Sequence, residues 1–202
     1  MEKKKIFLAS SSELVEDRKE FEIFINRKNK DWIDEGVFLE LIVWEDFLDA
    51  VSQTRLQDEY NKAIKESDIF IMLYFTKVGK YTEEEFNNAF NQFKSTNKPF
   101  IFTYFKDAPV TTGNVNKNDM MSLWAFQEKL KELGHFYTVY KNIDELKFKF
   151  NQQLEKLVNA KFIELKPDGS GQAVPVTITD NSVHQVHYGE GDNIGHDKIT
   201  GK

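Results

Sequence analysis

Glu85 is the residue whose type and position point most directly to chemistry. It stands in the segment TEEEFNNA (82–89), which follows a continuous apolar run (69–75) and the loop TKVGKY (76–81). A continuous apolar run is typical of a strand covered on both faces, and open α/β sheets bind ligands where loops leave the carboxyl ends of such strands. A glutamate at the start of the next helix is therefore our leading candidate for a catalytic residue.

A structural role for Glu85 is a concrete alternative, because Thr82 and Glu85 have the spacing of a capping box. In a capping box, Thr82 would begin the helix and the Glu85 carboxylate would bind a free backbone N–H. Phe86, Phe90 and Phe93 mark the helix face that meets the sheet. Glu85 flanks that face, so the sequence leaves both roles open.

Other polar residues follow the ends of two further predicted strands, 6–9 and 37–44. The carboxyl ends of parallel strands meet at one edge of a sheet, so we expect these residues to line a crevice with Glu85 at its rim. The candidates for substrate binding are Ser10, Ser11 and Ser12 after the first strand, Trp44, Glu45 and Asp46 at the end of the second, and Tyr81 in the loop after the third.

Arg18 is the remaining substrate-binding candidate. It shares the inward face of a predicted helix (13–28) with Leu14, Phe21 and Ile25. A guanidinium that points inward needs a carboxylate or a ligand anion, and we expect its partner to be Glu45, Asp46 or Glu85. The alternative is a solvated pair with Glu22, one helical turn away.

These residues favour cleavage of an N-glycosidic bond. A carboxylate can stabilise an oxocarbenium-like transition state at a ribose carbon, or attack that carbon. The bond to a cationic nicotinamide suits a single glutamate, because this base leaves neutral and needs no proton. We expect Glu85 to act on NAD or a related nucleotide, with the serines holding phosphate or ribose hydroxyls and Tyr81 packing on the base. The nucleotide is then a substrate, and no separate cofactor or metal is expected.

The elements that must position these residues alternate strictly between strand and helix. After the two strands above, strands are predicted at 69–75, 99–105 and 136–140, with helices at 13–28, 53–66, from 82 onward, 119–133 and 143–162. Five such repeats indicate an α/β fold with a doubly wound parallel sheet. Right-handed crossovers favour the flavodoxin-like strand order 2-1-3-4-5. We place this domain at residues 1–165.

Composition narrows the class of protein. The chain has 202 residues, of which 40% are apolar and 18 are phenylalanine, so one domain with an aromatic core is expected. The net charge is −6 and no long Lys/Arg run occurs, which argues against a nucleic-acid partner. The absence of cysteine excludes disulfides and thiol chemistry. We recognise no signal peptide or membrane-spanning stretch and expect a cytoplasmic protein.

Residues 166–202 differ in composition from the rest. KPDGSGQ (166–172) is typical of a linker, and Val174, Val176 and Ile178 alternate as in an exposed strand or hairpin. His184 and His187 would point to opposite faces of a strand, so we expect no metal site there. We interpret this tail as an arm that contacts a second copy of the chain or a partner signalling protein.

The serines after the first strand, the E-D-R segment (16–18), the D-I-F-I-M-L strand (68–73) and the TEEEFNNA helix start resemble the TIR-like superfamily. This group includes TIR domains and nucleoside deoxyribosyltransferase-like proteins, and the chain looks most similar to bacterial TIR-like domains of antiviral signalling. The resemblance covers residues 4–162. It implies a catalytic glutamate at Glu85, four residues before Ala89, in an N-glycosidase that assembly activates. The family's Trp-Cys before that glutamate is replaced here by Lys80-Tyr81.

Two functions without turnover compete with this interpretation. A TIR-like adaptor would pair with other domains through its surface and has no need for Arg18, Glu85 and nearby acids to converge. A nucleotide sensor would bind in the same crevice without cleaving its ligand. Release of nicotinamide from NAD separates the enzyme from both.

Overall fold

The parallel α/β architecture is built from five strands, each succeeded by a helix. The computed structural model describes residues 1–47, 56–111 and 116–166, so the predicted tail beyond Lys166 lies outside the described residues. Within these ranges the strands are β1 (Glu2–Ser10), β2 (Val37–Val43), β3 (Ile69–Tyr74), β4 (Phe100–Lys106) and β5 (Thr138–Tyr140). The helices are α1 (Val15–Trp32), α2 (Leu56–Glu66), α3 (Lys80–Thr96), α4 (Lys117–Glu132) and α5 (Ile143–Asn159), with short 3₁₀ turns η1 (Ser12–Leu14) and η2 (Trp44–Asp46).

The five strands form one sheet in the order β2-β1-β3-β4-β5, and every pair of neighbours is parallel. The predicted flavodoxin-like topology is therefore confirmed. β3 lies at the centre and is buried along its whole length, as its unbroken apolar sequence requires. The switch point falls between β1 and β3, where Ser10 pairs with Leu73.

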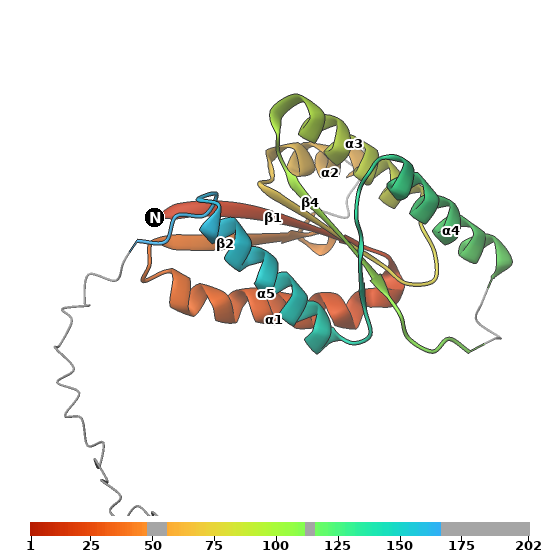
Figure 1. The fold of residues 1–202 in the computed structure, drawn as a ribbon, viewed down its shortest axis with the longest axis horizontal. Coiled ribbons are helices and arrows are strands. Elements are labelled where there is room, and N and C mark those ends of the chain that lie inside the picture. Colours follow the sequence, from red (N-terminus) through yellow and green to blue (C-terminus); the bar gives the residue numbers. More distant parts are fainter. Residues whose placement is uncertain (48–55, 112–115, 167–202) are drawn as a thin grey trace, which may run out of the picture. The chain divides into compact units, whose positions relative to one another are not determined.

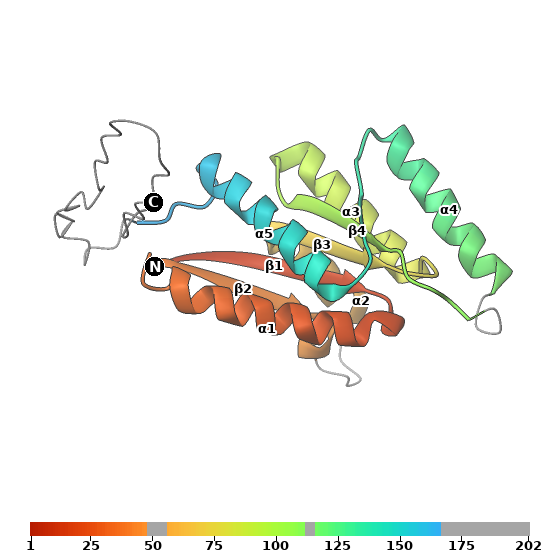
Figure 2. The ribbon, with the colours of Figure 1, turned by 60° about the horizontal axis from the view of Figure 1, so that its bottom comes forward.

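Helices cover both faces of the sheet (Figures 1 and 2). On one face, α1 and α5 pack Phe21 and Phe150 against Ile6 and Leu8 of β1. On the other, α2, α3 and α4 pack against the alternate residues of β1 and β3; Phe86 of α3 belongs to that cluster. Loops at the carboxyl edge can therefore receive side chains from helices of both layers.

β1 is longer than predicted, because it begins at Glu2 rather than at residue 6. The predicted strand 6–9 did not include the lysines at positions 3–5, but neighbouring acids neutralise these lysines. Lys3 bonds Glu40 of the adjacent β2 at 3.0 Å, and Lys5 bonds Glu66 of α2 at 3.3 Å. Lysines can occupy this strand because a carboxylate lies within reach of each.

A buried asparagine fixes α1 against the free edge of β2. The side chain of Asn29 accepts the N–H of Leu39 at 2.7 Å and donates to the carbonyl of Leu39 at 2.9 Å, as a neighbouring strand would. These two bonds satisfy outward-facing groups of an edge strand. They also set the height of α1 along the sheet and hence the position of Arg18, three helical turns earlier.

Candidate active site

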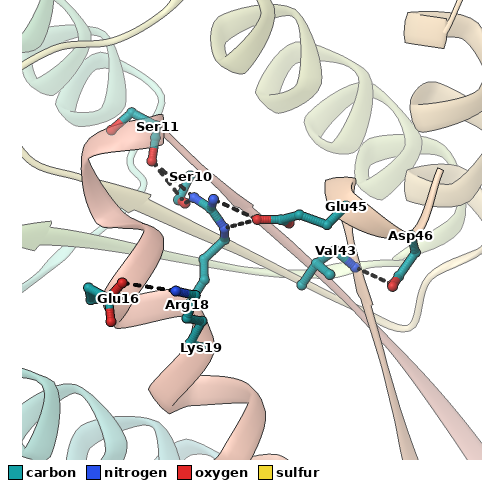
Figure 3. Close-up of polar contacts among 8 residues, drawn as sticks. All are labelled: Ser10, Ser11, Glu16, Arg18, Lys19, Val43, Glu45 and Asp46. Carbon is teal, nitrogen blue, oxygen red and sulfur yellow. Dashed lines mark hydrogen bonds and ion pairs between the residues drawn. The ribbon is translucent and has the colours of Figure 1, made fainter. Parts of the chain in front are cut away.

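Arg18 joins the loops that follow β1 and β2. Its Nε and Nη2 donate to one carboxylate oxygen of Glu45, at 3.1 and 2.7 Å, and its Nη1 donates to Ser10 Oγ at 2.6 Å and to the carbonyl of Ser11 at 3.0 Å. Figure 3 shows the guanidinium lying between the serines and Glu45. The Arg18 side chain is only 3% exposed, whereas that of Glu45 is 40% exposed.

The predicted burial of Arg18 and its pairing with Glu45 are thus confirmed, and the alternative pair with Glu22 is wrong. The reason is geometric, because the Arg18 side chain turns inward to Ser10 and Glu45 rather than along the helix surface. Arg18 organises two loops in this structure. Its predicted contact with a substrate stays a prediction.

The other residues predicted near the first two strands occupy different environments. Ser10 is the last residue of β1, Ser11 precedes η1, and the exposed Ser12 begins it. Asp46 accepts the N–H of Val43 at 2.9 Å and so terminates β2 (Figure 3). Trp44 begins η2, but its side chain lies outside the described part of the structure.

A second buried charge, Asp17, lies beside Arg18 in sequence and was missed by sequence reasoning. Asp17 accepts bonds from Lys106 Nζ at 2.9 Å and from the Tyr140 hydroxyl at 2.8 Å, and so links α1 to the ends of β4 and β5. Burial raises the pKa of Tyr140, and the bond to Asp17 and its charge raise it further, so this hydroxyl stays protonated. The signal was available, because Asp17 follows Leu14 by three residues and precedes Phe21 by four, on the inward face of the helix.

Glu13 closes the switch point between β1 and β3, and it too was not predicted. Its carboxylate accepts the N–H of Thr76 at 2.9 Å, the Thr76 hydroxyl at 2.7 Å and the Ser11 hydroxyl at 3.0 Å. Thr76 lies in the loop between β3 and α3, whereas Ser11 and Glu13 follow β1. The loops that were expected to flank the crevice are therefore joined by this carboxylate.

Glu85 lies in the second turn of α3 and is 9% exposed. It does not form the expected capping box with Thr82, because α3 begins at Lys80 with Gly79 in the capping position and no side-chain cap. Gly79 adopts the extended backbone that precedes a helix, so the chain turns into α3 before it reaches Thr82. The interpretation of Thr82 and Glu85 as a capping box is therefore wrong.

The charge of Glu85 acts on the end of the central strand. Burial raises the pKa of Tyr74, the last residue of β3, and the nearby negative charges of Glu85 and Glu83 raise it further. Tyr74 packs in the aromatic cluster beneath α3, in contact with Phe105 and Phe126. A carboxylate with little exposure thus lies near the carboxyl end of β3 and near the aromatic cluster that contains Tyr74.

The structure brings together only part of the predicted set. Ser10, Ser11, Arg18 and Glu45 form one connected group on the α1 side of the sheet. Glu85 belongs to α3, which packs on the opposite face. Tyr81 is the second residue of α3, and its side chain lies outside the described part of the structure.

The described ranges contain neither a metal-binding cluster nor a membrane-spanning helix. No group of three or more His, Asp or Glu side chains among residues 1–47, 56–111 and 116–166 is arranged to hold a metal ion. Within the same ranges, no helix combines the length and the apolar character that a membrane span requires. His184 and His187 belong to the tail, outside these ranges.

A family model described as "Domain of unknown function (DUF4062)" matches residues 5–155. No curated protein matches the chain. Among solved structures, one described as Clostridium botulinum CMP N-glycosidase, BcmB, shares 19% sequence identity with a TM-score of 0.46, over 74% of this chain and 99% of that chain.

Proposed function

The chain belongs to the DUF4062 family, and we propose that it is an N-glycosidase that hydrolyses the bond between base and ribose of NAD or a related nucleotide. The observation that carries the proposal is Glu85, a carboxylate that is 9% exposed beside the carboxyl end of the central strand. Glu85 lies in the second turn of α3, which begins at Lys80 with Gly79 in the capping position, so Glu85 is not part of a capping box with Thr82. Retaining a poorly solvated charge at a ligand-binding edge suits catalysis.

In the proposed reaction, the glycosidic C1′–N bond breaks and its electron pair leaves with the base. Positive charge then develops on C1′ and the ring oxygen, and the Glu85 carboxylate stabilises it. The oxygen of a water molecule bonds to C1′, and the water proton passes to the carboxylate and then to solvent. With NAD the base leaves as neutral nicotinamide, so the protein needs no acid to protonate it.

Low solvation makes this carboxylate effective. A charge that is surrounded by water is screened, whereas one held in a low-dielectric site acts strongly on a cation that develops within a few ångströms. The Tyr74 hydroxyl, whose pKa is raised, stays neutral and does not compete as a second anion. Tyr74, on which the charge of Glu85 acts, is itself held in a buried ring cluster with Phe105 and Phe126.

The residues around Arg18 would serve the sugar and phosphate of the substrate. Arg18 binds one oxygen of Glu45, and the other oxygen receives no bond within the described ranges. That oxygen is suited to accept a ribose hydroxyl. Ser12 supplies a hydroxyl donor after β1, whereas Ser10 is engaged by Arg18 and the Ser11 hydroxyl must first leave Glu13. The stacking of Tyr81 on the base remains part of the proposal.

The test is release of free base by the purified full chain. NAD, CMP, AMP and GMP are each incubated at high protein concentration, with and without a crowding agent that favours assembly, and the products are separated by chromatography. We expect stoichiometric base and the corresponding ribosyl product from at least one of them. Binding without any base release would identify a nucleotide sensor instead.

An adaptor function is the second candidate, and one surface feature favours it. Met121 and Trp124 of α4 lie one helical turn apart and are 52% and 57% exposed. Exposed aromatic and methionine side chains are enriched in protein interfaces. A chain that neither binds nor cleaves nucleotides but loses a partner when Trp124 is changed to Ser would fit this function. The proposed roles in bacterial antiviral defence and in assembly through the tail apply to either candidate.

A further inference from the structure

The switch point contains a group of hydrogen-bond donors that a carboxylate of the chain itself occupies. The backbone N–H of Thr76, its hydroxyl and the hydroxyl of Ser11 all donate to Glu13, at 2.9, 2.7 and 3.0 Å. These donors come from two loops that are far apart in sequence and meet where open α/β sheets bind their ligands. Backbone N–H groups and hydroxyls that converge in this way form a typical anion site.

A lysine next to these donors favours an anion that carries more negative charge than a carboxylate. Lys77 follows Thr76 directly, is half-buried, and makes no hydrogen bond or ion pair within the described ranges. Partly buried lysines are normally paired, because removing an ammonium group from water is unfavourable. The loop itself is held from its other side, where the N–H of Val78 donates to Ser122 of α4 at 3.1 Å. The loop that carries Thr76 and Lys77 is therefore also held by a contact that does not involve Glu13.

We propose that Ser11, Thr76 and Lys77 form the phosphate site for the nucleotide, and that Glu13 fills this site until a phosphate displaces it. This inference rests on the proposed function for the identity of the ligand. A phosphate group offers more acceptor oxygens than a carboxylate and carries more charge, so it can use the three donors and Lys77 together. Glu13 is exposed and can turn outward into solvent when it is displaced. It thereby acts as an internal competitor that weakens binding of the substrate.

The experiment measures binding rather than turnover. The full chain carrying Glu85→Gln is titrated calorimetrically with nicotinamide mononucleotide, with nicotinamide riboside, which lacks the phosphate, and with inorganic phosphate. Adding Glu13→Gln should lower the Kd for the mononucleotide and for phosphate by about tenfold, because a competing charge is removed. The Kd for the riboside should not change. Thr76→Val and Lys77→Gln should each raise the Kd for the mononucleotide.

Glu16→Gln is the matched control, because this substitution removes the same charge at a nearby site. Glu16 is an exposed acid that pairs with Lys19 and not with the donors of the proposed site. An equal gain in Glu16→Gln would mean a general charge effect and would overturn the proposal. So would a gain shared by the riboside, or no binding of phosphate or mononucleotide by either Glu13→Gln or Glu13→Ala. Circular dichroism of each variant checks that it is folded.

The two proposals fail in different ways. If the mononucleotide binds with the expected ranking among variants and the wild-type chain releases no base, the phosphate site stands and the glycosidase function is wrong. If base is released while the Glu13, Thr76 and Lys77 variants bind the mononucleotide like the parent, the glycosidase function stands and the phosphate site is wrong. Glu13 then serves only to join the two loops through its hydrogen bonds.

Discussion

Arg18 and Glu45 form an ion pair in which the two partners differ sharply in exposure. The guanidinium of Arg18 is 3% exposed and the carboxylate of Glu45 is 40% exposed, at a distance of 2.7 Å. The buried cation lies in α1, and the more exposed acid lies in η2 after β2, so the pair fixes the edge of the predicted crevice. Its energetic consequence can be measured directly.

A double-mutant cycle with Arg18→Met and Glu45→Gln should give a coupling energy of about 1–3 kcal/mol in urea unfolding, as expected for contacting residues of one polar network. The exposed pair of Glu16 and Lys19, drawn in the same view, is the control (Figure 3). Its coupling should be about 0.2–0.5 kcal/mol, because water screens it and it spans one helical turn. Equal coupling in the two cycles would show that Arg18 is not buried in solution.

Alkaline pH should destabilise the fold through its buried tyrosines. Burial raises the pKa of Tyr74, Tyr104 and Tyr140 above the ordinary value, so the folded state keeps protons that the unfolded chain loses from about pH 10 upward. The unfolded state then binds fewer protons, and the free energy of unfolding must fall as pH rises above that value. Below it this contribution is fully present.

The measurement is the free energy of unfolding in urea at pH 8, 9, 10 and 11. Each raised tyrosine contributes a slope of up to about 1.4 kcal/mol per pH unit above pH 10. Tyr104→Phe should remove one such contribution, because desolvation alone raises the pKa of Tyr104. A Tyr104→Phe chain with an unchanged slope would mean that this hydroxyl ionises equally well in the folded protein.

A chain that ends after Pro167 should fold as well as the full chain. The segment after α5 still contributes to the domain, since Ile163 is buried and the N–H of Lys166 donates to the carbonyl of Glu35 at 2.8 Å. The domain forms a compact unit that spans Met1–Pro167. We expect the Tm to change by less than about 3 °C. A truncated chain that aggregates or melts far lower would make the tail part of the core.

Truncation also tests the proposed role of the tail in assembly. The full chain and the truncated chain are compared by sedimentation velocity at the same protein concentrations. If the tail is the contact, the truncated chain should sediment as a monomer at every concentration at which the full chain associates. Identical association of the two chains would locate the interface within residues 1–167.

Much of the fold was predictable because it depends on patterns of many residues. The continuous apolar run 69–75 was typical of a strand covered on both faces, and it forms β3 at the centre of the sheet. Single boundaries were less predictable. Thr82 matched a capping box, yet α3 begins at Lys80, because the backbone turns at Gly79 and no side chain is needed. Local motifs compete with loop geometry that the sequence does not reveal.

The site was predictable only where one residue's burial demanded a partner. Arg18 on an apolar face required an acid, and Glu45 supplies it. Asp17 and Glu13 were missed, because their partners Tyr140 and Thr76 come from distant strand ends that only the folded sheet brings together. Spacing along one helix indicated that Asp17 points inward, but it could not identify what it meets.

The central claim concerns the carboxylate of Glu85, and Glu85→Gln tests it most directly, because this change keeps size and removes charge. Glu83→Gln is the matched control, since Glu83 lies in the same helix and its charge also acts on Tyr74.

The measurement is the rate of base release from the nucleotide that the wild-type chain cleaves, at equal concentrations of the folded variants. We predict a loss of about 10²-fold or more in Glu85→Gln, a change of less than about 1 kcal/mol in its free energy of unfolding, and near wild-type turnover in Glu83→Gln. Full turnover in Glu85→Gln would contradict the account.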